Sequence, residues 1–246
     1  MQITSVKDNV KDRKPYTALL YCPPGVGKST AIGLIAEKSK GRTLVLDVDR
    51  TLDNTLAKKE VVKDISKIDT VKIDIINTFD DWSATVIELQ QMKEQGQLKY
   101  DNIAVDNISE LERCILSDLG NKGKNKGVPA QSDYQYMQFK LVNSLRYMKQ
   151  LNVNIIWTAW EDVRQIVSPD GTSYSQIIPK MSQKIVDNIC GLCDVVGKIA
   201  VKRDGTHGVL LEATTNIYAK NQLDSRKGCL VEDFANFERW FYESYH

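Results

Sequence analysis

Residues 17–30 place the tightest constraint on what this chain can fold into. They read TALLYCPPGVGKST, an apolar run followed by a turn of Pro and Gly and then by Gly27, Lys28 and Ser29. A segment with apolar residues at helical spacing comes next and ends at Gly41. Backbone N–H groups at the start of a helix bind anions, and this order brings a glycine-rich turn to such a start. The sequence therefore predicts a strand, a phosphate-binding loop and a helix.

The predicted loop assigns chemistry to single residues. In loops of this kind the lysine reaches the β- and γ-phosphates of a nucleotide and the next hydroxyl holds Mg²⁺, which gives these roles to Lys28 and Ser29. The expected ligands are therefore ATP and Mg²⁺. The residues expected to contact the nucleotide are Pro24, Gly25, Val26, Gly27, Lys28, Ser29 and Thr30. Cys22 stands where the G-x-x-x-x-G-K-[ST] pattern has its first glycine, so we expect alkylation of its thiol to impair nucleotide binding.

Length and composition favour one domain rather than several. A chain of 246 residues can bury one sizeable core, and we expect a single domain, 1–246. Its parts would be an N-terminal arm (1–15), a nucleotide-binding core (16–160) and a hairpin-rich C-terminal part (161–246). A net charge of +1 excludes a globally basic coat for nucleic acid. With no long apolar run and five cysteines in no regular framework, we expect a soluble protein of the cytoplasm and no membrane partner.

Strand and helix patterns alternate along the first two thirds of the chain. This order is typical of an α/β fold with a mostly parallel sheet flanked by helices. The strands expected after the loop are 42–47, 70–76, 102–106 and 153–158. The helices expected between them begin at Thr78 and at Ser132, the second with a capping box to Gln135, and a short one runs through Leu111 and Ile115.

The last third of the chain has a different pattern. Residues 163–178 and 198–212 each contain a Gly turn between β-like runs, which predicts two C-terminal β-hairpins. A helix near 181–195 separates them, and its Cys190 and Cys193 lie on the apolar side, which favours core packing over a zinc site. An amphipathic helix around residues 234–241 is expected to close the chain.

Two acids are candidates for the chemistry. Asp106 ends the predicted strand 102–106, and in nucleoside triphosphatases an acid at this place lies beside the phosphate-bound Mg²⁺. The next residue, Asn107, stands where an AAA+ ATPase carries a catalytic glutamate, and an amide cannot act as a base. The general base is therefore sought in residues 46–50, LDVDR, which resemble the strand end where RecA-type ATPases carry their glutamate. This assigns Asp49, with Glu110 and Glu161 as rivals.

Taken together, these motifs resemble the phage-encoded RecA-like ATPases of the Sak group, short relatives of RecA and RadA linked to single-strand annealing. The resemblance spans 16–228 and rests on YCPPGVGKST, LDVDR, YDNIAVDNISEL, residues 132–162 and NIYAKNQLDSRKG. It implies a RecA-like P-loop NTPase core that hydrolyses ATP with Mg²⁺ and is stimulated by single-stranded DNA. It also implies a homo-oligomer, ring or filament, with ATP at subunit interfaces, a single-strand-binding protein as a further partner, and the cytoplasm of a bacterial host.

The resemblance also assigns DNA-binding residues. Two loops of the RecA core face single-stranded DNA, and at the first of them this chain has Lys122, Lys124 and Lys126 among glycines. The second corresponds to the hairpin 163–178 and its flanks, with Arg164 and Lys180. Lysines on a flexible loop can follow a phosphate backbone without fixed geometry. The alternative is that these cations belong to an ordinary solvated surface.

Further residues complete the expected site. Lys220 and Arg226 match the family's cationic C-terminal segment and would reach the nucleotide of a neighbouring subunit. At the sensor position the chain has Trp160 in place of a polar residue, so Thr158 or Glu161 would contact the γ-phosphate instead. Three other functions stay open: a helicase-loader or remodelling ATPase of the AAA+ type, a small-molecule P-loop kinase, and a nucleotide-dependent binding module that hardly turns over.

Overall fold

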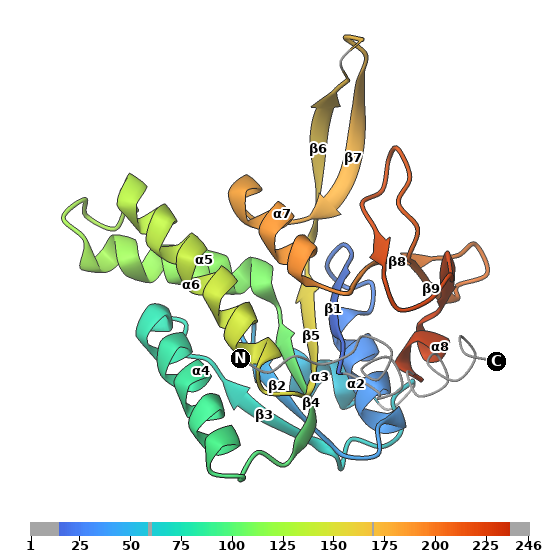
Figure 1. Cartoon of the computed structure of the whole chain (residues 1–246), viewed down its shortest axis with the longest axis horizontal. Helices are drawn as coiled ribbons and strands as arrows, with labels where there is room; N and C mark the ends of the chain where they lie inside the picture. Colours follow the sequence, from blue (N-terminus) through green and yellow to red (C-terminus); the bar gives the residue numbers. More distant parts are fainter. Residues whose placement is uncertain (1–14, 59–60, 169, 237–246) are drawn as a thin grey trace, which may run out of the picture.

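In the computed structural model the chain folds around one large sheet (Figure 1). The structure describes residues 15–58, 61–168 and 170–236. The strands are β1 Thr17–Tyr21, β2 Arg42–Asp47, β3 Ile68–Lys72, β4 Tyr100–Asp106, β5 Asn154–Ala159, β6 Glu161–Val167, β7 Ser173–Pro179, β8 Val195–Val201, β9 His207–Leu210, β10 Lys220–Asn221 and β11 Gly228–Leu230. The helices are α2 Lys28–Lys38, α3 Leu52–Leu56, α4 Thr78–Glu94, α5 Ile108–Lys122, α6 Gln131–Lys149, α7 Gln183–Leu192 and α8 Val231–Ala235.

The centre of the sheet is parallel and its far edge is antiparallel. Six strands run parallel in the order β8-β1-β5-β4-β2-β3. Beyond β8 the strands β9 and β11 continue the sheet in antiparallel pairing, and β10 also pairs with β8. The carboxyl ends of the parallel strands meet at one edge, which is where open α/β sheets bind ligands. β1 lies near the middle of this edge, so the loop that follows it is central.

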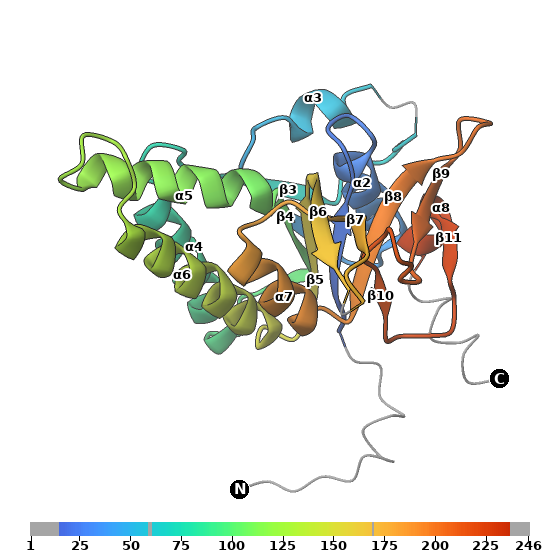
Figure 2. The ribbon, with the colours of Figure 1, turned by 90° about the horizontal axis from the view of Figure 1, so that it is seen from above.

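Helices cover both faces of the sheet, as Figure 2 shows. Because successive side chains of a strand point to opposite faces, β1 sends Leu19 and Tyr21 into one core and Ala18 and Leu20 into the other. The first core packs against α4, α5, α6 and α7, and the second against α2, α3 and α8. Strands buried on both faces explain why the sequence shows near-continuous apolar runs.

Several element boundaries differ from those expected. The strand expected at 70–76 is β3 at Ile68–Lys72, and the strand after α6 is β5 at Asn154–Ala159. The helix expected to be short is α5, which runs 15 residues because apolar residues continue past Ile115. Helix α6 begins at Gln131, and its start is closed by Asp133, whose carboxylate accepts from the Ala130 N–H at 2.7 Å, rather than by a Ser132–Gln135 box.

The hairpins of the C-terminal third form as expected. β6 pairs antiparallel with β7, and β8 with β9, across the predicted Gly turns. The helix between them, α7, puts Cys190 in the first core, and Cys193 follows it there. The closing helix is the short α8, and the rest of the expected segment lies outside the described residues, as does most of the N-terminal arm. No described helix combines the length and apolarity that crossing a membrane requires.

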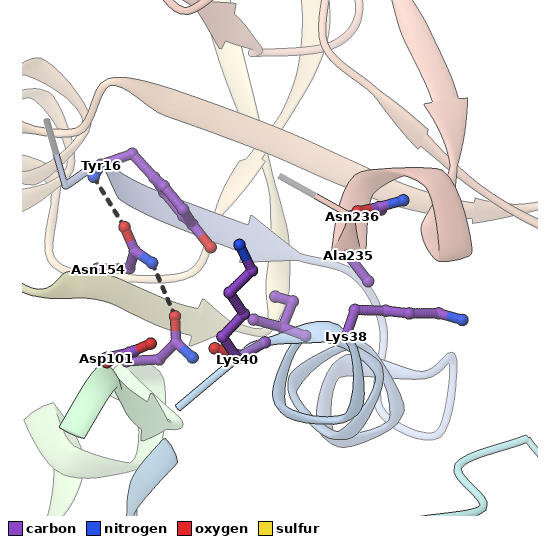
Figure 3. A pocket seen from close by; sticks show the side chains of 10 residues that line it. Tyr16, Lys38, Lys40, Asp101, Asn154, Ala235 and Asn236 are labelled. Carbon is purple, nitrogen blue, oxygen red and sulfur yellow. Dashed lines mark hydrogen bonds between the residues drawn. The ribbon is translucent and has the colours of Figure 1, made fainter. Parts of the chain in front are cut away.

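A chain of side-chain amides joins the amino ends of the strands at the opposite edge (Figure 3). Asn154 accepts from the Tyr16 N–H at 3.2 Å and donates to Asn102 at 2.8 Å, and Asn102 donates to Thr43 at 3.0 Å. These bonds link the residue before β1 to β5, β4 and β2. The cavity beside them measures about 40 Å³, which has room for a water molecule but not for a nucleotide.

Candidate functional site

The loop after β1 has the backbone that phosphate binding requires. Gly25 has φ 77° and Gly27 has φ 110°, values that favour glycine over any residue with a Cβ. Gly27 caps the start of α2, so the first N–H groups of this helix face the loop. Lys28 is the first residue of α2 and is 7% exposed, and its ammonium donates to the Pro23 carbonyl at 3.3 Å across the loop. The Lys28 ammonium is therefore held over the turn in which phosphates are expected to bind.

Hydrogen bonds under the loop join helix α2 to two neighbouring strands. Ser29 Oγ donates to one carboxylate oxygen of Asp106 at 2.5 Å, and Thr158 Oγ1 donates to the other at 2.6 Å. The three residues come from α2 and from the ends of β4 and β5, which lie side by side. The structure thus brings together the two residues that the sequence assigned to Mg²⁺. It also bonds Thr158, one of the two residues expected to replace the sensor, to Asp106.

Burial raises the pKa values of the two acids at this edge, Asp106 and Asp47. Asp106 is 1% exposed, and burial raises its pKa above the usual range, although the hydroxyls of Ser29 and Thr158 oppose the shift. Asp47 ends β2 next to it and is fully buried, and neither of its carboxylate oxygens has a hydrogen-bond partner among the described residues. Burial, followed by the charges of Asp106 and Asp49, raises the pKa of Asp47 to about 6. This edge therefore carries an electrostatic cost that a bound cation would relieve.

Asn107 connects two parts of the site. Its side-chain oxygen accepts from the Glu110 N–H at 2.9 Å and so caps α5, while its amide nitrogen donates to Asp49 Oδ2 at 2.8 Å. The other oxygen of Asp49 accepts from the Thr51 hydroxyl at 2.9 Å. An asparagine can donate and accept at once, which a glutamate in its place could not do. Asn107 therefore fixes the orientation of Asp49.

A hollow of about 1090 Å³ opens in front of the loop. Its phosphate side is formed by Gly25, Gly27, Lys28, Ser29 and Thr30. Apolar residues of α2, α3 and the segment after it also line the hollow: Leu34, Leu56, Val61 and Val62. Polar groups for phosphates and apolar side chains for a flat base together suit a nucleotide.

The three candidate bases occupy different places. Asp49 and Glu110 both line the hollow. Glu161 instead lies at the start of β6, where its carboxylate pairs at 3.1 Å with Lys198 of β8, a strand of the large sheet. The geometry therefore favours Asp49 and Glu110 over Glu161 as the group that contacts a water molecule in the hollow.

The family of the chain follows from a comparison of its sequence. A sequence model of the AAA domain matches residues 14–223, which is most of the chain's 246 residues. The chain belongs to the AAA domain family. No curated protein sequence matches it. The match makes this a nucleotide-binding domain of the P-loop ATPase type, and the predicted α/β fold, with a mostly parallel sheet flanked by helices, is confirmed.

Cys22 lies under the loop of the AAA domain rather than beside it. Its side chain is fully buried, and burial raises the pKa of the thiol to about 11. Alkylation needs an accessible thiolate. Burial and the raised pKa therefore disfavour alkylation of Cys22 in the folded chain, and the effect of alkylation on nucleotide binding stays a prediction.

The residues predicted to bind DNA lie at two separate tips. Lys124 and Lys126 are exposed in the turn between α5 and α6. Lys122 is not in this loop but in the last turn of α5, where its ammonium pairs with Asp80 at 2.8 Å and with Asp118 at 3.0 Å. Figure 1 shows this tip well away from the β6–β7 hairpin.

On the β6–β7 hairpin, Arg164 lies 3.8 Å from Asp187 of α7. Lys180 follows β7 with its side chain exposed, while its backbone holds the base of the hairpin: its N–H donates to Trp160 O and its carbonyl accepts from the Ser109 hydroxyl. The two cations therefore lie toward the base of the hairpin, near α7, and not at its tip.

The two cations expected to act in trans have partners within their own chain. Lys220 donates to the carbonyls of Cys190, Gly191 and Cys193 at 3.3, 3.0 and 2.6 Å, which closes the carboxyl end of α7. All three ammonium protons are used there, so Lys220 has a structural role. Arg226 pairs with Asp224 at 3.0 Å.

Among the residues that line the hollow and that sequence reasoning missed are Thr206 and His207. Thr206 and His207 come from the β8–β9 hairpin, far along the chain from the loop that they face. Nothing in their immediate sequence marks them, because a Thr-His pair after a turn is ordinary. Only the position of β8 beside β1 brings them to the site.

Proposed function

We propose that this AAA domain binds ATP with Mg²⁺ in the hollow and hydrolyses it. The observation that carries the proposal is the junction of Lys28, Ser29 and Asp106. The lysine lies over a glycine-rich turn, and the hydroxyl of the next residue is bonded to a buried acid at the end of a neighbouring strand. That combination serves phosphate and a phosphate-bound cation together.

The residues present fit Mg²⁺. Ser29 and Asp106 would hold it, since hydroxyl and carboxylate oxygens are the ligands it takes in nucleotide sites. Within the described part of the chain no cluster of three or more His, Cys, Asp or Glu side chains could hold a metal. One or two protein ligands are nevertheless usual where phosphates complete the coordination. When bound, Mg²⁺ neutralises charge on the phosphate oxygens.

The chain's own residues would bind the phosphates and activate the attacking water. The backbone N–H groups of residues 25–30 bind the phosphates, and Lys28 offsets their charge. Asp49, held by Asn107 and Thr51, accepts a proton from the attacking water. Glu110 lines the same hollow and is the alternative acceptor.

The test of this function is the variant Lys28→Ala. We expect it to abolish ATP hydrolysis and weaken ATP binding, measured by phosphate release and by the fluorescence of Trp160, which lines the hollow. Lys38→Ala, at the exposed far end of the same helix, is the matched control and keeps wild-type turnover. Hydrolysis that survives Lys28→Ala in a pure preparation contradicts the proposal.

We further propose that hydrolysis is coupled to single-stranded DNA during recombination or annealing, as the resemblance to the phage-encoded Sak group implies. The exposed Lys124 and Lys126 at the α5–α6 tip support the proposal, together with Arg164 and Lys180 on and beside the β6–β7 hairpin. The setting would be the cytoplasm of a bacterial host, with a single-strand-binding protein as a partner. Phosphate release should rise with single-stranded DNA more than with duplex DNA. Stimulation by a remodelling target, or phosphate transfer to a nucleoside, would favour the AAA+ or kinase alternative.

We also propose that the domain assembles into a ring or filament with ATP at the interfaces. Because Lys220 closes α7, the trans cation is assigned to Arg226 alone. Arg226 lies on the segment between β10 and β11 and would exchange Asp224 for a neighbour's phosphate. Such a group stabilises charge on the transferred phosphoryl.

A further inference from the structure

His207, the first residue of β9 in the β8–β9 hairpin, contacts the phosphate loop. Its ring atom Nδ1 lies 3.0 Å from the carbonyl oxygen of Val26, a residue 181 positions earlier in the chain. A carbonyl oxygen can only accept a hydrogen bond, so the ring nitrogen that faces it must carry the proton. The contact therefore requires the tautomer of His207 with Nδ1 protonated.

The ring also packs on the next residue of the loop. A Cβ placed on Gly27 would come within 3.2 Å of Nδ1 and 3.6 Å of Cε1 of His207. The C=O of Val26 and the N–H of Gly27 belong to one trans peptide group and point in opposite directions. Holding the carbonyl against His207 thus fixes the direction in which the Gly27 N–H points.

The element that carries His207 is firmly attached to the strand that carries the loop. β8 pairs in parallel with β1 up to Tyr21, directly before the loop. β9 lies beside β8 (Figure 2), and the register of this pair puts His207 opposite Val201. The turn between them is closed by Asp204, whose carboxylate accepts from the N–H and the hydroxyl of Thr206. The ring is therefore carried by a strand that pairs on both sides, with β8 and with β11, and not by a free loop.

We propose that His207 is a positioning residue of the phosphate loop. Its Nδ1–H holds the peptide between Val26 and Gly27 in the orientation that presents the Gly27 N–H to phosphate, so nucleotide affinity depends on the β8–β9 hairpin. The proposal rests on the ATP-binding function stated above and adds to it a residue outside the P-loop motif.

The first test reads the tautomer directly and needs no nucleotide. The chain has two histidines, His207 and His246, so ¹⁵N-histidine labelling gives two sets of ring signals, which His246→Ala assigns. We expect the ring of His207 to be protonated at Nδ1 at neutral pH. A ring protonated only at Nε2 overturns the proposal, because Nδ1 could then not donate to Val26.

The second test compares His207→Ala with His207→Asn. An asparagine side chain places an N–H near the position of Nδ1, so it can keep the bond that alanine loses. We expect about a five-fold rise in the Kd for ATP, and in KM, with alanine, the scale of one hydrogen bond, and a near-normal Kd with asparagine. The value of kcat should stay close to wild type in both, because the loop binds ground state and transition state alike.

Arg203→Ala is the control, since Arg203 is exposed on the same turn and does not line the hollow. Its Kd and melting temperature should match those of the wild type. Wild-type affinity in His207→Ala overturns the proposal, and so does equal loss in the alanine and asparagine variants. If the wild type itself binds no ATP, the proposed function fails, while the ring tautomer still decides whether His207 holds Val26.

Discussion

At the scale of single residues, the most informative position is Asn107. It stands where AAA+ ATPases carry a base, yet here it holds Asp49 with its amide and caps α5 with its oxygen. Asn107, whose amide cannot exchange protons with a substrate water, thus positions Asp49, whose carboxylate can. The loss of a glutamate at this position does not imply the loss of a base from the site.

Three variants separate these roles. Asp49→Asn should lower kcat by about 10²-fold with little change in ATP affinity, the scale of losing a general base. Asn107→Asp keeps the acceptor that caps α5 but replaces the donor to Asp49 by a second carboxylate, so kcat should fall. Glu110→Gln, which leaves its own N–H bonded to Asn107, is the matched control and should change kcat little. A large loss in Glu110→Gln alone would transfer the role of base to Glu110.

At the scale of elements, the α5–α6 tip shows how a run of like charges divides between structure and surface. Lys122 pairs with an acid of α4 and with one of its own helix, and Asp118 also accepts from the Phe79 N–H at 2.9 Å. Lys122 therefore links the start of α4 to the end of α5. Lys124 and Lys126, two and four residues further on, extend into solvent.

DNA binding should follow this division. If Lys124 and Lys126 contact phosphates, replacing both by alanine should lower the slope of log K against log salt by about 1.4, since each contact on a single strand releases about 0.7 counterion. Lys122→Ala should lower the melting temperature and leave the slope unchanged. The measurement is fluorescence anisotropy of labelled single-stranded DNA over a salt series. A slope unchanged by the double variant would place both lysines in the solvated surface.

At the scale of the whole molecule, the acid at the end of β2 makes stability depend on pH. The pKa of Asp47 is about 6 in the folded chain and about 3.9 when unfolded, so the folded state binds more protons between these values. This contribution is fully present below pH 4 and is lost as pH rises through 6. The contribution of Asp47 therefore makes the folded chain less stable at neutral pH than at weakly acid pH.

Asp47→Asn tests this dependence. The free energy of unfolding of the variant, relative to the wild type, should rise by about 2 kcal/mol from pH 4.5 to 7.5, because each pKa unit is worth about 1.4 kcal/mol. Urea unfolding of the nucleotide-free protein at several pH values measures it. Other acids titrate in both proteins and cancel in the difference. A difference that stays constant across this range would show that Asp47 is not protonated in the folded state.

The assembly is tested by mixing variants. Arg226→Ala and Lys28→Ala should each be inactive alone, and their mixture should regain part of the ATPase activity if Arg226 serves a neighbour's nucleotide. A mixture of Lys28→Ala with the double variant is the control and should regain none. No recovery despite proven co-assembly would leave Arg226 with Asp224, where its carbonyl also accepts from Asn221 at 3.1 Å.

The sequence by itself determined what depends on neighbours along the chain. Turn residues and periodicity act over a few positions. Local patterns therefore predict the strand, glycine turn and helix around Lys28, the alternation of strands and helices that makes the sheet parallel, and the two hairpins. Pairing the ends of separate strands needs the strand order, which no local pattern contains.

Only the tertiary structure decided how the polar groups meet. Asp49 and Asn107 are 58 residues apart, and Val26 and His207 are 181 apart. Each pair meets because β4 lies beside β2, and β8 beside β1, in one sheet. The same packing buries Cys22 and directs Lys220 to the end of α7. Burial and partner choice are properties of the assembled sheet, and they convert residues that look reactive in the sequence into structural ones.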